Sequence, residues 1–142
     1  MRNKNIAVVG CGYWGKNLVR NFFELGSLKS LYDYDDNTAV GLAKSYGVES
    51  SSFQQILNDN QIKGIVVATP AIQHFEIAKD CILAGKNVFV EKPLALNIED
   101  ANELVELSEQ NNVEIMVGHL LRYHPVFIEL LRITKQGILG DI

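Results

Sequence analysis

An acid, a base and a proline stand together at Glu91, Lys92 and Pro93, where they abruptly end the apolar run 87–90. Lysine can act as a general base, but an exposed lysine, with a pKa of about 10.4, is a poor base at neutral pH. The segment is therefore either a surface turn with two solvated charges or the point at which the chain brings a reactive lysine into a site.

A second group consists of glycines. Gly10, Gly12 and Gly15 have the G-x-G-x-x-G spacing and stand between an apolar run and a helical pattern. In a dinucleotide-binding turn the first glycine permits the tight turn, the second lets the backbone approach the pyrophosphate, and the third lets helix and strand pack closely. N–H groups at the start of the helix bind the anion. The spacing predicts such a turn, in which Tyr13 and Trp14 either flank the cofactor or pack on the sheet.

An acidic residue follows the next apolar segment. Asp33 lies 23 residues after Gly10, where an acid can hydrogen-bond the adenosine ribose hydroxyls of a dinucleotide. Its neighbours Tyr34, Asp35 and Asp36 include no arginine that could take a 2′-phosphate, so NAD is favoured over NADP as the cofactor. Asp35 and Asp36 themselves are typical of turns and helix caps.

The elements that must position these residues alternate between short apolar strands and longer helices. The predicted strands are 6–9, 28–33, a weak strand near residue 48, 65–68, 87–90 and 113–117. The predicted helices are 13–25, 37–46, 53–58, 72–84, one that begins after the N-cap Asn97, and 125–136. Strands that are apolar on both faces and alternate with helices indicate a parallel sheet covered on both sides. The predicted fold class is a doubly wound α/β (Rossmann) fold.

This fold predicts where the chemical groups meet. With the usual strand order 3-2-1-4-5-6, the ligand lies beside the carboxyl ends of strands one and four. The segments that follow strands four and five then reach the edge that carries Gly10, and Lys92 faces the crevice near the nicotinamide end. Thr69 and Pro70 either line the crevice or simply end the strand. His74 falls in the first turn of the next helix, where a solvated histidine is more common than a working one.

Composition excludes several classes of function. The chain has 142 residues and a net charge of −4, and its lysines and arginines are scattered, which does not favour a nucleic-acid partner. No apolar run approaches the roughly 18–20 residues that a membrane span requires. The two cysteines, Cys11 and Cys81, have no metal-ligand spacing, so we expect reduced structural thiols, no metal site and a cytoplasmic protein.

Five segments together resemble the Gfo/Idh/MocA oxidoreductases and occur in the order found in that family. They are VVGCGYWGKN at 8–17, DYD at 33–35, ATPAIQH at 68–74, AGKNVFVEKPLALN at 84–97 and GHLLRYHP at 118–125. Within the family, GYWGKNLVRNF and GHLLRYHP are most similar to bacterial UDP-N-acetylglucosaminuronate 3-dehydrogenases, which serve the biosynthesis of surface polysaccharides.

The resemblance implies roles for individual residues. Lys92 corresponds to the family's acid–base residue, and Glu91 to a residue near the nicotinamide ribose. Thr69, Pro70 and His74 match positions that line the cofactor. Arg122 matches a residue near the substrate end of the cleft.

The resemblance also implies that residues 1–142 form the N-terminal dinucleotide-binding domain of a longer protein, in which a substrate domain, absent here, drives homo-oligomerisation. The segment 140–142 looks like the entry to a further strand.

Three functions are consistent with the sequence. The leading hypothesis is hydride transfer between a carbon of a sugar or sugar nucleotide and NAD, with Lys92 taking the proton of the reacting hydroxyl. The second is a dinucleotide sensor that performs no chemistry, and the third is an assembly domain whose glycines serve only packing. For the first hypothesis we expect the isolated domain to bind NAD and to turn over little substrate or none.

Overall fold

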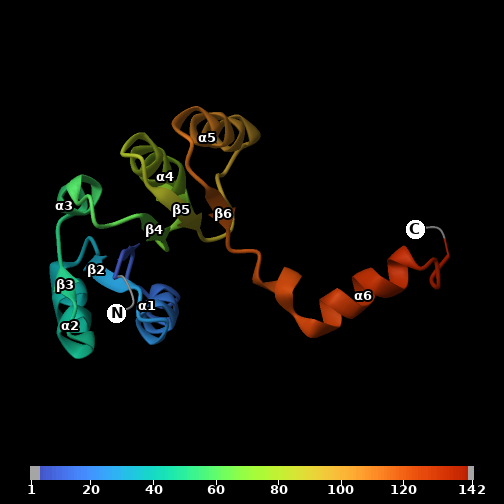
Figure 1. Ribbon diagram of the computed structural model, residues 1–142, viewed down its shortest axis with the longest axis horizontal. Coiled ribbons are helices and arrows are strands. Elements are labelled where there is room, and N and C mark those ends of the chain that lie inside the picture. The colour runs from blue at the N-terminus through green and yellow to red at the C-terminus, as the bar shows by residue number, and fades with distance from the viewer. Residues whose placement is uncertain (1–3, 141–142) are drawn as a thin grey trace.

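The computed structural model describes residues 4–140, which contain a six-stranded parallel sheet with the strand order β3-β2-β1-β4-β5-β6 (Figure 1). The strands are β1 (Ile6–Val9), β2 (Leu28–Tyr32), β3 (Glu49–Ser50), β4 (Gly64–Val67), β5 (Asn87–Val90) and β6 (Ile115–Val117). The predicted doubly wound fold is confirmed, and so is the strand order, which reverses between β1 and β4.

The first five α-helices connect consecutive strands and cover both faces of the sheet, and the sixth follows the last strand. They are α1 (Gly15–Glu24), α2 (Asp36–Tyr46), α3 (Phe53–Asn58), α4 (His74–Leu83), α5 (Ile98–Asn111) and α6 (Pro125–Lys135), with short 3₁₀ helices η1 (Ala71–Gln73) and η2 (Leu120–Tyr123). Figure 1 shows α1 and α2 on one side of the sheet and α4 and α5 on the other.

Successive side chains along the central strands point to opposite faces of the sheet, so each face has its own hydrophobic core. In β1, Val8 packs with Leu18 and Val19 of α1, whereas Ala7 and Val9 pack in the core that includes α4 and α5. All five side chains are buried, as expected when both faces of a parallel strand are covered. The two cores hold the sheet rigid beneath the loops at its carboxyl edge.

Several predicted boundaries shift by a few residues for local reasons. The helix predicted from residue 13 begins at Gly15, because the preceding residues form the turn. The helix predicted from residue 72 is divided into η1 and α4, which starts at His74. Asn97 caps α5 as predicted, since its Oδ1 accepts a hydrogen bond from the Asp100 N–H at 2.7 Å. The predicted strand entry at 140–142 falls largely on Asp141 and Ile142, which lie outside the described residues.

The last helix differs from the others in its environment. Helix α6 contacts η2 and projects away from the sheet (Figure 1). Its apolar side chains are largely exposed, with Val126 70% and Ile128 54% accessible. No helix among residues 4–140 is both long enough and apolar enough to cross a membrane. The same residues contain no cluster of three or more His, Cys, Asp or Glu side chains that could hold a metal ion.

A buried lysine holds the loop between α3 and β4. Lys86 is 5% exposed, and its Nζ donates hydrogen bonds to the carbonyl oxygens of Asp59 at 2.7 Å and Ile62 at 3.0 Å. Burial lowers the pKa of Lys86, and the charge of Lys63 lowers it further. The ammonium group therefore acts as a structural donor at the amino-terminal edge of the sheet, opposite the edge that carries the glycine turn.

We expect Lys86→Met to lower the free energy of unfolding by about 1–3 kcal/mol, because two carbonyl groups lose their donor. Urea unfolding followed by circular dichroism measures this change. The matched control is Lys44→Met at the exposed end of α2, which should change stability by less than about 0.5 kcal/mol. Equal stability of the two variants would contradict the structural role of Lys86.

Candidate functional site

The glycine turn lies in direct contact with the end of the neighbouring strand, β4. Gly10 has a φ of +95°, and a Cβ at this position would lie 2.6 Å from the carbonyl carbon and oxygen of Ala68. A Cβ at Gly15 would lie 2.0 Å from the Gly10 oxygen. Both distances are too short for a side chain, so packing alone requires glycine at these two positions.

At position 12 the absence of a side chain has a different explanation. Gly12 is exposed, and no heavy atom of the described residues, apart from its own and those of its two chain neighbours, lies within 4 Å of the place where its Cβ would stand. Helix α1 begins just beyond it without a side-chain cap and without an acidic residue in its first turn. The turn therefore presents open backbone at a helix N-terminus, which suits the approach of an anionic group.

Asp33 accepts hydrogen bonds from two backbone N–H groups, one of which, that of Cys11, belongs to the glycine turn. Its Oδ2 accepts from the Cys11 N–H at 2.6 Å, and its Oδ1 accepts from the Asp35 N–H at 2.9 Å. Each carboxylate oxygen has a further lone pair, so a ribose hydroxyl can still donate to it. Asp33 thus stands beside the turn, at the end of β2, where the sequence predicts it.

Cys11 lies inside the turn as a protonated thiol. It is fully buried, and burial together with the nearby Asp33 charge raises its pKa to about 12, although Lys16 opposes this shift. Its Sγ donates to the Tyr32 carbonyl at 3.6 Å. Burial also raises the pKa of Cys81, and both cysteines are free. Neither thiol has the thiolate character that nucleophilic or redox chemistry requires.

A hydrogen bond joins the turn to the end of β5. The Trp14 Nε1–H donates to Glu91 Oε1 at 2.6 Å, and the Lys92 N–H donates to Glu91 Oε2 at 3.3 Å. Glu91 is only 8% exposed, whereas Trp14 is 42% exposed and Tyr13 is 92% exposed. Tyr13 therefore does not pack on the sheet, and the contact that the structure gives for Trp14 is its hydrogen bond to Glu91.

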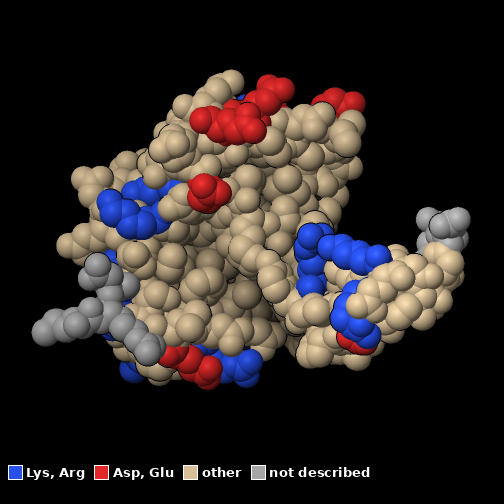
Figure 2. Space-filling model, turned by 45° about the vertical axis from the view of Figure 1, so that its right-hand side comes forward, with Lys and Arg blue, Asp and Glu red and all other residues tan. Residues whose placement is uncertain are grey.

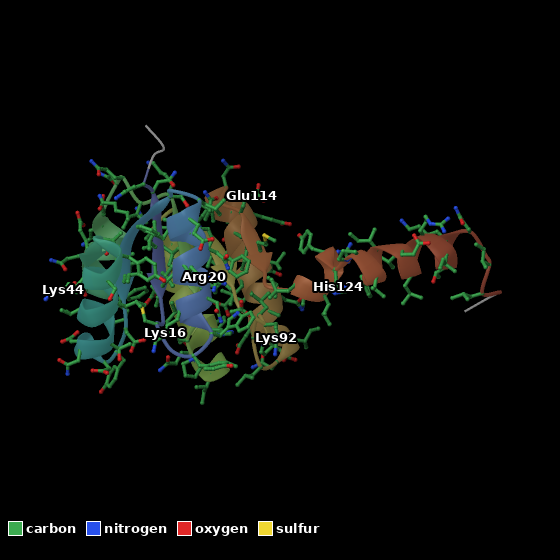
Figure 3. All side chains as sticks on the ribbon, turned by 90° about the horizontal axis from the view of Figure 1, so that it is seen from below. Lys16, Arg20, Lys44, Lys92, Glu114 and His124 are labelled. Carbon is green, nitrogen blue, oxygen red and sulfur yellow. The ribbon has the colours of Figure 1, made fainter. Side chains whose placement is uncertain are left out.

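Lys92 itself is exposed, and its Nζ makes no hydrogen bond or ion pair with any residue that the structure describes. The peptide bond between Lys92 and Pro93 is cis. Figure 3 shows Lys92 and Lys16 toward the same edge of the sheet, with Glu114 at the opposite edge. The base expected at residues 91–93 thus lies on the edge that carries the glycine turn.

His74 joins the segments that follow β4 and β5. It is 1% exposed, with Nδ1 2.6 Å from the Pro93 carbonyl oxygen and Nε2 2.8 Å from the Thr69 carbonyl oxygen. The expectation of a solvated histidine at this position is wrong, because the short η1 helix turns the ring inward between the two loops. Thr69 carries a buried hydroxyl oxygen that has no hydrogen-bond partner among the described residues.

These segments enclose a cleft of about 840 Å³ at the carboxyl edge of the sheet. Its lining comprises Trp14, Ala68, Thr69, Ala71, His74, Glu91, Lys92, Gly118, His119, Leu120, Leu121, Arg122 and Phe127. In the space-filling view, Lys and Arg side chains gather at the recess between the body of the domain and the projecting C-terminal helix (Figure 2).

The cleft brings together Trp14, Thr69, His74, Glu91, Lys92 and Arg122 of the predicted site. The three glycines, Tyr13, Asp33 and Pro70 do not line it. Sequence reasoning missed the apolar wall formed by Leu120, Leu121 and Phe127. The signal that could have revealed this wall is the position of η2 directly after the end of β6, at the same edge as the other loops.

A family model described as an oxidoreductase family with an NAD-binding Rossmann fold, Gfo/Idh/MocA, matches residues 4–119. An uncharacterised oxidoreductase of Streptococcus pneumoniae is 32% identical over 136 residues, which cover 95% of this chain and 37% of that protein. Inositol 2-dehydrogenase 2 of Saccharopolyspora erythraea is also 32% identical, over 96% of this chain and 42% of its own length.

Among solved structures, GenD2 from gentamicin A biosynthesis in complex with NAD has a TM-score of 0.84 and 31% identity. The match covers 91% of this chain and 38% of GenD2. The present chain therefore spans about two fifths of the length of the proteins that it matches.

We expect Gly15→Ala to lower the free energy of unfolding by about 1–3 kcal/mol, because the new Cβ would overlap the Gly10 carbonyl. The matched control is Gly41→Ala within α2, where no described heavy atom outside the chain neighbours and the backbone of the same helix lies within 4 Å of the new methyl group. This substitution should raise stability by about 0.5–1 kcal/mol. Urea unfolding of both variants measures the difference. A Gly15→Ala variant as stable as Gly41→Ala would refute the packing argument.

Proposed function

This chain belongs to the Gfo/Idh/MocA family of oxidoreductases, and we propose that it binds NAD and contributes Lys92 as the acid–base residue of a dehydrogenase. The observation that carries the proposal is the position of Lys92 in the cleft, on the same edge as the glycine turn and with an unpaired Nζ among the described residues. Family membership and the fold support the cofactor, and the position of the lysine supports the chemistry.

The residues at the carboxyl edge fit a dinucleotide. The open space at Gly12 leaves room for a pyrophosphate beside the start of α1, and Asp33 keeps acceptor capacity for ribose hydroxyls. The buried Thr69 hydroxyl lacks a partner among residues 4–140, and Thr69 lines the cleft, so a rotation about its χ1 would offer the hydroxyl to the cofactor. Since residues 33–36 include no arginine, we propose NAD rather than NADP.

Nicotinamide supplies a hydride acceptor when it is bound. The role that we propose for Lys92 is to bind the substrate hydroxyl and accept its proton at Nζ, while the C–H bond of the same carbon gives up the hydride and a carbonyl forms. The apolar side chains of Leu120, Leu121 and Phe127 give the cleft an apolar wall against which the ring of a substrate or of the nicotinamide can pack. Thr69, Pro70 and His74 remain proposed cofactor neighbours, as does Tyr13.

For the substrate we propose a ring that carries several hydroxyl groups, namely a sugar or a sugar nucleotide. One relative is named as an inositol dehydrogenase, which acts on such a ring. Arg122 at the cleft offers a cation for an acidic sugar or a phosphate. The resemblance of residues 12–22 and 118–125 to UDP-N-acetylglucosaminuronate 3-dehydrogenases favours a cytoplasmic enzyme of surface-polysaccharide biosynthesis.

We further propose that residues 1–142 are the dinucleotide-binding domain of a two-domain protein that forms homo-oligomers through a substrate domain. The rival function is a dinucleotide sensor without chemistry. Both functions require NAD binding, but only the enzyme requires the amine of Lys92. An assembly domain requires neither.

Gly12→Ala should abolish NAD binding, or weaken it at least about tenfold, without loss of stability, because its methyl group enters space that only the ligand would fill. Isothermal titration calorimetry with NAD measures affinity, and urea unfolding measures stability. The control is Gly41→Ala, which should bind NAD like the unmodified chain. An unmodified chain that fails to bind NAD would favour the assembly domain.

Lys92→Ala should lower kcat by about 10²–10⁴-fold in the polypeptide that contains the substrate domain, while NAD still binds. The measurement is NADH formation at 340 nm with candidate sugar nucleotides, and the control is Lys44→Ala on the exposed face of α2. Undiminished turnover by the Lys92 variant would exclude Lys92 as the base. The 142-residue chain alone should bind NAD and form little or no NADH.

A further inference from the structure

Glu91 is a buried carboxylate that has no cationic partner among the described residues. Its side chain lies in the wall of the cleft and is 8% exposed as a residue. Its two hydrogen bonds come from neutral groups, the Trp14 indole and the Lys92 backbone N–H, and no lysine, arginine or histidine of residues 4–140 forms an ion pair with it. A buried carboxylate is costly unless a positive charge compensates it.

The carboxylate is also held in place from two sides. Trp14 Nε1 donates to Oε1 at 2.6 Å on the side of α1. On the side of β6, a Cβ at Gly118 would lie only 3.1 Å from each of the two carboxylate oxygens, so the backbone there closes directly on the group. Glu91 therefore presents a fixed negative charge at one place in the cleft.

The strand order determines which part of a dinucleotide comes near this charge. Asp33 follows β2, the glycine turn follows β1, and Glu91 follows β5 on the other side of the reversal. If the adenosine ribose is at Asp33 and the pyrophosphate at the turn, as the proposed function requires, the nicotinamide half extends toward β4 and β5. That half is the only part of the cofactor whose charge depends on its redox state, since the ring is cationic in NAD⁺ and neutral in NADH.

We propose that Glu91 discriminates between the two redox states of the cofactor, and that its fixed charge strengthens binding of NAD⁺ relative to NADH. This inference rests on the proposed NAD site. Ribose and pyrophosphate contacts are common to both forms, so they cancel in the ratio of affinities. Lys92 and Arg122 also line the cleft and oppose the effect. The contribution of Glu91 is therefore measured by the change in the ratio of NAD⁺ to NADH affinity when Glu91 is replaced. The ratio of the unmodified chain does not measure it.

The decisive variant is Glu91→Gln, which keeps the length of the side chain and an oxygen that can accept from Trp14 Nε1. Calorimetric titrations of the 142-residue chain with NAD⁺ and with NADH give the two dissociation constants. We expect Glu91→Gln to weaken NAD⁺ binding about tenfold relative to NADH binding, the size of an attraction between unit charges several ångströms apart at a solvated cleft. A tenfold change raises the two-electron potential of the bound cofactor by about 30 mV.

Three further variants separate charge from shape. Glu91→Asp keeps the charge and should retain more of the NAD⁺ preference than Glu91→Gln, whereas a purely steric role predicts the reverse. Lys92→Met removes a cation from the same cleft and should shift the ratio in the opposite direction. Glu114 lies at the opposite edge of the sheet, so Glu114→Gln should leave the ratio of the two dissociation constants unchanged (Figure 3). Trp14, the only tryptophan of the chain, provides an independent fluorescence readout of binding at the cleft.

The outcomes distinguish this inference from the function on which it rests. If the unmodified chain binds neither form of the cofactor, both are wrong. If it binds both forms and Glu91→Gln leaves the ratio unchanged, or Glu91→Asp loses more of the preference than Glu91→Gln, the role of Glu91 is refuted and the NAD site stands. Thermal unfolding by circular dichroism confirms that each variant is folded before its ratio is used.

Discussion

The site depends on one backbone contact at the carboxyl edge, the approach of the first loop to the end of β4. Gly10 and Gly15 have no side chain, and this absence lets the turn, the start of α1 and the residues after β4 meet at distances that a methyl group would prevent. The turn is then near enough to β2 for the Cys11 N–H to bond to Asp33. The same compactness brings Trp14 within hydrogen-bond distance of Glu91. The contribution of the turn to the cleft is Trp14, which lines it together with Glu91.

The fold followed from the sequence because its determinants are local. Apolar runs of four or five residues, glycine after the helices, and the Asn97 cap each depend on near neighbours, and parallel strands with helical crossovers admit few topologies. The direction of the strands then placed residues 68–70 and 91–93 at one edge before any side-chain contact was known. Boundaries were harder to predict where a tight turn replaces the first turn of a helix, as at Tyr13 and Trp14.

The side-chain contacts of the site could not be predicted in this way. The bond between Trp14 and Glu91 joins residues 77 positions apart, and the ring of His74 reaches a carbonyl 19 positions away. Neither pairing has a sequence signature, because each depends on the angle at which a helix leaves its strand. For His74, its place in a first helical turn argued for solvent exposure, and the preceding 3₁₀ turn reversed that expectation. The sequence predicts α6 as a helix, and its exposed apolar side chains are a feature that only the structure shows.

At Lys92 the main chain is held by hydrogen bonds, whereas no described protein group restrains the side chain. The Lys92 N–H bonds to Glu91, and the following carbonyl, that of Pro93, contacts His74, so the main chain is held on both sides of the amine. The Lys92 side chain is exposed and lines the cleft together with Glu91 and Arg122. In the role that we propose, Lys92 as a base needs access to its substrate, whereas Glu91 as a charge that tunes a cofactor must stay in one place. The burial of Glu91 and the exposure of Lys92 suit these opposite requirements.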